Sequence, residues 1–103
     1  MDYKILCIAK SREASIFKAL GIDLIQLNNN DDVNKKLTEI DLEDYALIIY
    51  QSNLHDELKS LRDKYRNLTL PIFLSIQINE NDPEKALEEL SQNITNTLGV
   101  TIL

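Results

Sequence analysis

The chain has 103 residues, of which 44% are apolar and 27% are charged, and its formal net charge is −6. These fractions are typical of one ordinary globular domain and exclude a disordered chain. The acidic excess argues against nucleic acid or an anionic membrane surface as a partner, because like charges repel. No apolar run approaches the roughly 20 residues of a bilayer span, and the N-terminus lacks a signal-peptide pattern. We therefore expect a cytoplasmic protein with no direct membrane insertion.

Four short apolar runs dominate the sequence, at residues 3–9, 24–27, 46–50 and 70–76. Each is followed by a segment with the apolar spacing of a helix. This alternation predicts an α/β fold, a single Rossmann-like domain over residues 1–103 with a four-stranded parallel sheet and helices on both faces. The first and third runs are apolar on both faces, so we place them at the centre of the sheet. With right-handed crossovers the predicted strand order is 2-1-3-4.

The predicted core lies on the central and fourth strands. Six side chains are expected to be deeply buried: Ile5, Ile8, Leu47, Ile49, Ile72 and Leu74. Ser75 and Gln77 suit an edge position for the fourth strand, and Pro71 is tolerated at a strand start or on an edge.

Three helices are predicted between the strands. The first begins after Ser11 and ends at Gly21, which can adopt the left-handed conformation of a helix end. The second begins in the polar turn 28–32, and Ser52 or Asn53 is expected to cap the third. Their apolar stripes are Ile16, Phe17 and Leu20 in the first, Val33, Leu37 and Ile40 in the second, and Leu54, Leu58, Leu61 and Tyr65 in the third.

The last segment, residues 83–103, is predicted to be a C-terminal helix followed by an apolar tail. Asp82 and Pro83 form a strong helix start, and Gly99 ends the helix. Glu84, Glu88 and Glu89 are expected on its solvated side. Because free chain ends usually fray, an apolar end either packs under its own domain or docks on a partner. The candidate partner-binding residues are Leu87, Leu90, Ile94, Leu98, Val100, Ile102 and Leu103.

The predicted carboxyl ends of the strands carry no carboxylate, histidine or glycine loop, although ligands of such sheets bind there. Lys10 and Ser11 could hold an anion at a helix start, but a phosphate loop needs glycines. Cys7 lies inside a strand and is expected to be a core residue, and His55 to lie in a solvated first turn. We expect no catalytic residue, cofactor or metal site. The alternative is a small phosphocarrier or anion-binding regulatory domain that uses Lys10, Ser11 and Cys7.

Several short motifs occur in order along the chain. Tyr3-Lys4-Ile5 opens the first strand, and residues 17–22 (Phe-Lys-Ala-Leu-Gly-Ile) end the first helix. The third strand covers residues 45–52, the fourth begins with residues 70–74 (Leu-Pro-Ile-Phe-Leu), and the chain ends with residues 99–103 (Gly-Val-Thr-Ile-Leu). Together they resemble the F subunit of the V-type (vacuolar and archaeal type) rotary ATPases, especially the short bacterial forms.

The resemblance implies a non-catalytic central-stalk, or rotor, component that braces a coiled-coil shaft and couples ATP hydrolysis or synthesis to ion transport. The implied direct partner is the shaft itself, the D subunit of such enzymes, and the catalytic head and the connector to the membrane ring are reached through the shaft. The implied location is cytoplasmic and peripheral to the membrane, within a membrane-attached complex. The C-terminal helix is implied to be the mobile part that faces the shaft. A free-standing regulatory adaptor with the same fold is a further alternative.

Overall fold

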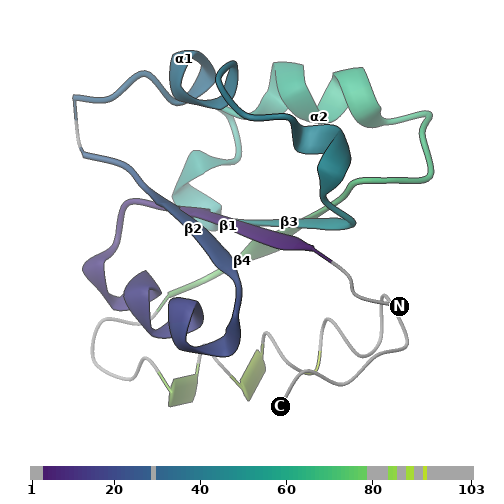
Figure 1. Ribbon diagram of the computed structural model, residues 1–103. Helices are drawn as coiled ribbons and strands as arrows, with labels where there is room; N and C mark the ends of the chain where they lie inside the picture. The colour runs from purple at the N-terminus through teal and green to yellow at the C-terminus, as the bar shows by residue number, and fades with distance from the viewer. Residues whose placement is uncertain (1–3, 29, 79–83, 86–87, 90–91, 93–103) are drawn as a thin grey trace.

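The computed structural model describes residues 4–28, 30–78, 84–85, 88–89 and 92. Four strands form one parallel sheet in the order β2-β1-β3-β4 (Figure 1). The predicted α/β class, parallel sheet and strand order are confirmed. The strands are β1 (Ile5–Ala9), β2 (Asp23–Gln26), β3 (Leu47–Gln51) and β4 (Ile72–Ile76).

The helical segments lie on both faces of the sheet. A 3-10 helix, η1 (Arg12–Leu20), lies on one face, and the α-helices α1 (Val33–Leu37) and α2 (Lys59–Tyr65) lie on the other (Figure 1). We call these the η1 face and the α face. Two further 3-10 turns, η2 (Leu42–Asp44) and η3 (Ser52–Leu54), flank β3.

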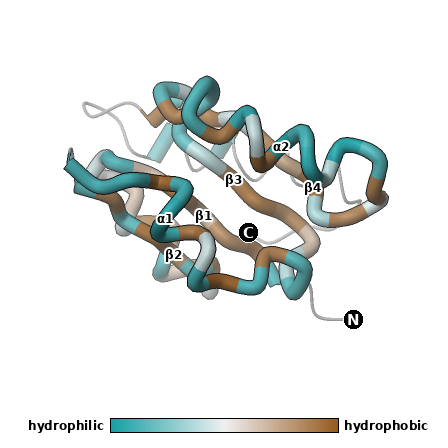
Figure 2. Tube along the Cα trace, turned by 90° about the horizontal axis from the view of Figure 1, so that it is seen from above, coloured by the Kyte–Doolittle hydropathy of each residue, from teal (hydrophilic) through white to brown (hydrophobic). Residues whose placement is uncertain are grey.

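The parallel register divides the strand residues between two core clusters. Cys7 lies opposite Leu24 on one neighbouring strand and Ile49 on the other, and all three belong to the cluster on the η1 face. Leu6, Ile8 and Ile48 belong to the cluster on the α face, because successive side chains of a strand point to opposite faces. Every residue of β1 is buried, and Figure 2 shows apolar β1 and β3 between more polar helices. The central placement of both strands is confirmed.

The first predicted helix is present and is of the 3-10 type. Residues 12–20 form a 3-10 helix of nine residues, in which the Gly21 amide bonds to the Lys18 carbonyl three residues back. The sequence is compatible with the shorter repeat: Ala14, Phe17 and Leu20 recur every third residue and therefore align along one side of a 3-10 helix. Ala14 and Phe17 are fully buried, and Leu20 packs against the same cluster. Gly21 has φ +80°, as its role as a helix end predicted.

The second helix begins as predicted and is short. Asp32 caps it, with its Oδ1 accepting hydrogen bonds from the amides of Asn34 (3.0 Å) and Lys35 (3.3 Å). Val33 and Leu37 are buried on the α face, and Ile40 packs there in part. The predicted apolar stripe is confirmed.

The third helix does not begin at Ser52 or Asn53 with a side-chain cap. Residues 52–54 form a 3-10 turn, and α2 begins only at Lys59 without a side-chain cap. The Lys59 amide bonds to the Asp56 carbonyl three residues back (3.2 Å), while the His55 carbonyl accepts instead from Arg62 Nη2 (2.8 Å). Helix α2 therefore starts later than predicted, although the Leu58 amide already bonds to the Leu54 carbonyl four residues back (3.0 Å). The apolar stripe still packs on the α face: Leu54, Leu58 and Tyr65 are buried, and Leu61 partly so.

The fourth strand is an edge strand, as Ser75 and Gln77 indicated. Deep burial of Ile72 and Leu74 was predicted and is wrong: both are half-buried, whereas Leu47 and Ile49 beside them are fully buried. The physical reason is the strand order, because β4 has a strand neighbour only on its β3 side within the described part of the chain. Ile5 and Ile8 are buried as predicted.

Candidate functional site

The place where a parallel sheet of this order binds ligands is the crevice beyond the carboxyl ends of β1 and β3. The chain crosses from one side of the sheet to the other between these two strands, so their ends leave a gap. In this protein the gap lies between Ala9 and Lys10 on one side and Gln51 on the other. We refer to it as the carboxyl edge.

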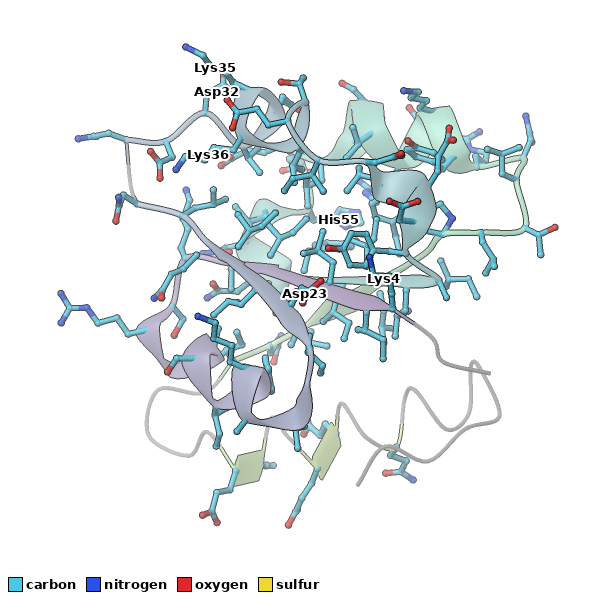
Figure 3. All side chains as sticks on the ribbon, in the orientation of Figure 1. Lys4, Asp23, Asp32, Lys35, Lys36 and His55 are labelled. Atoms are coloured by element: carbon cyan, nitrogen blue, oxygen red, sulfur yellow. The ribbon has the colours of Figure 1, made fainter. Side chains whose placement is uncertain are left out.

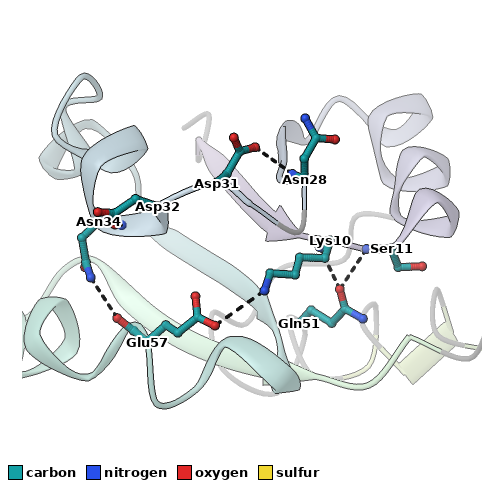
Figure 4. A network of polar contacts seen from close by, with 8 residues as sticks. All are labelled: Lys10, Ser11, Asn28, Asp31, Asp32, Asn34, Gln51 and Glu57. Atoms are coloured by element: carbon teal, nitrogen blue, oxygen red, sulfur yellow. Dashed lines mark hydrogen bonds and ion pairs between the residues drawn. The ribbon is translucent and has the colours of Figure 1, made fainter.

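The Gln51 side chain forms hydrogen bonds across the carboxyl edge. Its Oε1 accepts hydrogen bonds from the backbone amides of Lys10 (2.9 Å) and Ser11 (3.0 Å), as Figure 4 shows. Gln26 Nε2 donates to the Ser11 carbonyl from the other side (3.2 Å), and Ser11 is only 7% exposed. Amides at a helix start are the donors that hold phosphate groups in other proteins. Here the carboxamide oxygen of Gln51 accepts from both of these amides, in the place of a bound anion.

The Lys10 side chain is also engaged. Its Nζ lies 3.6 Å from Glu57 Oε1, and Asn34 Nδ2 donates to the Glu57 carbonyl (3.3 Å) (Figure 4). Lys10 is half-buried rather than a fully solvated turn cation. These contacts link the end of β1 to α1 and to the turn before α2, so the cation that an anion site would need already has a carboxylate partner.

Cys7 is enclosed within the core. It lies in β1 with no exposed surface, and burial raises the pKa of its thiol to about 12. A thiol with such a pKa stays protonated at neutral pH, and only the thiolate is a good nucleophile. The predicted core role of Cys7 is confirmed, and the phosphocarrier alternative loses its candidate nucleophile.

His55 contacts an aromatic neighbour. Its Nδ1 lies 2.7 Å from the Tyr50 hydroxyl oxygen, and the two rings stack with centroids 5.8 Å apart. His55 is exposed in the turn before α2, labelled in Figure 3, as the sequence indicated, but its ring is not free. Among the described residues no group of histidine, cysteine and acidic side chains could hold a metal ion.

The opposite end of the sheet carries a second polar contact. The Tyr45 hydroxyl donates to Asp23 Oδ2 (2.8 Å), and Lys4 Nζ lies 5.5 Å from the centroid of the Tyr45 ring. Lys4 and Asp23 are labelled in Figure 3. Partial burial, the hydrogen bond to Asp23 and the charges of Asp23 and Asp44 raise the pKa of Tyr45 to about 12. This contact ties β2 to the turn before β3.

Comparison with known proteins identifies the family. The model of the family described as ATP synthase (F/14-kDa) subunit matches residues 5–94. The chain belongs to this family. It is 25% identical over 103 residues to the F subunit of the V-type ATP synthase of Clostridium botulinum (strain Eklund 17B), with the whole of both chains covered. It is 24% identical over 102 residues to the corresponding F subunit of Clostridium perfringens (strain 13), covering 98% of this chain and 97% of that one.

The predicted partner-binding residues of this family member lie outside the described residues. They are Leu87, Leu90, Ile94, Leu98, Val100, Ile102 and Leu103. Within the same segment Glu84, Glu88 and Glu89 are helical and exposed, as predicted. Among the residues that the structure describes, no helix is long and apolar enough to cross a membrane.

The sequence did not reveal the double acceptor role of Gln51. Its position at the end of a central strand was evident, but the sequence does not distinguish a hydrogen-bonded carboxamide from a solvated one. The available signal was indirect: Gln51 faces the turn after β1, where the amides of Lys10 and Ser11 need an acceptor once Ser11 is buried.

Proposed function

We propose that this protein is the F subunit of a V-type rotary ATPase and acts as a non-catalytic part of its central stalk. The observation that carries the proposal is the family match over residues 5–94, together with relatives of the same length that are named as F subunits of V-type ATP synthases. A chain of this length that aligns from end to end with such proteins is best explained as their counterpart.

The carboxyl edge supports a role without bond chemistry. A catalytic site needs a nucleophile or acid–base pair beside a place for the substrate. Gln51 occupies that place, and Cys7 is a buried, protonated thiol. In the proposed role the sheet is a rigid mount, and the work is mechanical: to stiffen the shaft as it turns and to couple ATP hydrolysis or synthesis to ion transport.

The C-terminal segment is the proposed docking surface for the shaft. Glu84, Lys85, Glu88, Glu89 and Gln92 are helical and exposed. At about 100° per residue these five positions cover one side of a helix, spanning roughly 140°. The same periodicity assigns the leucines at 87, 90 and 98 and Ile94 to the other side. Together with Val100, Ile102 and Leu103 this stripe would bury apolar area against a helical partner. Such burial would stabilise the contact by about 25 cal/mol per Å².

The proposed direct partner is the coiled-coil shaft, the D subunit of the rotary ATPase, and the catalytic head and the connector to the membrane ring are reached through it. In this arrangement the chain is one domain over residues 1–103 and is cytoplasmic, held at the membrane only through the complex. Its partners include no nucleic acid.

The test is binding of the full chain to the purified shaft protein of the same organism, measured by calorimetry. Ile94→Asp places a charge in the proposed stripe, and Gln92→Asp places the same charge at a described exposed position two residues away. We expect Ile94→Asp to weaken binding at least tenfold, or about 1.4 kcal/mol, and Gln92→Asp to change it less than twofold. Equal effects, or no binding by the natural chain, would refute the proposed docking.

A further inference from the structure

A second surface lies at the border between the end of α2 and the start of β4. Leu68 is 55% exposed and Leu70 is 45% exposed, and they are the exposed large apolar residues of the described part of the chain. Beside them is an open groove of about 340 Å³, lined by Arg62, Tyr65, Arg66, Leu68, Pro71 and Phe73 among others. Figure 2 shows the turn between α2 and β4 at the margin of the molecule. We call this surface the α2–β4 border.

The border includes an edge of β4 that no described strand covers. The Ile72 amide bonds to the Ala46 carbonyl (3.0 Å), so the backbone groups of Ile72 point toward β3. Because these directions alternate along a strand, the backbone N–H and C=O of Phe73 and Ser75 point away from the sheet. No strand pairs with this edge within the described residues. Such an edge can accept an added strand from another chain.

The border is also cationic in an acidic protein. Residues 59–66 hold four cations and one acid, and residues 64–78 hold no acid, although the net charge of the chain is −6. Asp63 is paired with Arg66 (2.8 Å), and 71% of the Arg66 side chain remains exposed. Arg62 Nε is enclosed and has no partner among the described residues, although its Nη2 donates to the His55 carbonyl. The exposed Arg66 side chain therefore gives the groove a guanidinium that a carboxylate from another chain can reach.

We propose that the α2–β4 border binds an extended segment of a partner protein that alternates acidic and apolar residues. The backbone of the segment would pair with Phe73 and Ser75 along the β4 edge. Its carboxylates would meet Arg62 and Arg66, since Phe73 and α2 share the α face. Its apolar residues would cover Leu68 and Leu70, which otherwise remain in water. This surface is separate from the C-terminal segment and does not depend on the rotor role.

Charge favours this occupant over a second copy of the chain. Edge-to-edge pairing of two β4 strands about a two-fold axis would bring the cationic borders of both copies together. That juxtaposition is repulsive, whereas an acidic segment is attracted and its carboxylates match the forked donors of arginine.

The probe is a short synthetic peptide that alternates glutamate with valine or leucine, and its matched control carries lysine in place of each glutamate. Each is titrated into the isotope-labelled full chain while amide resonances are followed. We expect the acidic peptide to shift the amides of Phe73 and Ser75 and to bind more weakly as salt is added. We expect the lysine peptide to bind at least tenfold more weakly.

Two variants localise the binding. Arg66→Glu and Leu68→Ser are both at exposed positions and should fold normally. Each is expected to weaken binding of the acidic peptide about fivefold or more. Lys18→Glu makes the same charge change on η1, on the other face of the sheet, and should leave binding within twofold.

Three results would overturn the proposal. The first is no shift with the acidic peptide, and the second is equal binding of the two peptides. The third is a concentration-dependent dimer that Leu68→Ser abolishes, which would assign the border to a second copy of the chain.

Discussion

The carboxyl edge and the α2–β4 border differ in how far their side chains are paired or buried within the chain. At the carboxyl edge Gln51 satisfies two backbone amides, and Lys10 has a carboxylate partner. At the border Leu68 and Leu70 remain exposed and Arg62 Nε has no partner among the described residues. The fold therefore closes the place where related sheet architectures bind ligands, and it leaves unmet groups at the edge of the sheet. Among the described residues, the polar groups at the carboxyl edge are therefore satisfied within the chain, whereas the border keeps apolar side chains exposed.

The largest contrast is expected in thiol reactivity. Cys7 is buried with a raised pKa, so a thiol reagent reaches it only when the chain opens. With an unfolding free energy of about 5 kcal/mol or more, the open fraction is on the order of 10⁻⁴ or lower. Leu68→Cys, in a Cys7→Ala background, should react at the rate of an exposed thiol, at least a thousandfold faster. Comparable reaction rates of the two thiols, measured with a chromogenic disulfide reagent, would contradict the burial of Cys7.

The next contrast is in stability. Ile49→Ala removes a fully buried side chain of β3 and should lower the free energy of unfolding by about 2–4 kcal/mol. Leu68→Ala at the border should change it by no more than about 0.5 kcal/mol. Urea unfolding followed by circular dichroism measures both. A large loss for Leu68→Ala would mean that the border belongs to the core.

Gln51 gives a sharper test of the closed edge. Gln51→Ala leaves the amides of Lys10 and Ser11 without an acceptor and should cost about 1–3 kcal/mol. Gln77→Ala, an exposed glutamine just after β4, is the matched control and should be close to neutral. If the two variants unfold at the same urea concentration, water replaces the carboxamide as acceptor without loss of stability. The carboxyl edge would then be open to solvent.

The smallest expected effect concerns Tyr45. Its pKa of about 12 lies above the ordinary value of about 10, so the folded state favours the neutral phenol. The corresponding stability is present below pH 10 and is lost as the pH rises from about 10 to 12. The difference in phenolate absorbance between the natural chain and Tyr45→Phe isolates this group. A normal titration near pH 10 would show that the contact with Asp23 does not persist in solution.

The main features of the fold were predictable because they depend on apolar patterning. Runs that are apolar on both faces marked β1 and β3 as central, and the polar turn at 28–32 marked the start of α1. The burial of Cys7 followed from its place inside such a run.

Details that depend on competing hydrogen bonds were not predictable in the same way. The every-third-residue alignment of Ala14, Phe17 and Leu20 was present in the sequence but fits an α-helix nearly as well. The late start of α2 accompanies a hydrogen bond from the Arg62 side chain to the His55 carbonyl, a contact that no local pattern signals. The half-burial of Ile72 and Leu74 followed from the edge position of β4 rather than from their apolar character.

The most direct test of the central claim is native mass spectrometry of complexes purified through a tag on this chain in its own cells. The account predicts a complex that contains this chain and the coiled-coil shaft, and loss of that partner in the Ile94→Asp variant but not in Gln92→Asp. Recovery of the chain without any shaft protein, or a complex that both variants retain equally, would contradict it.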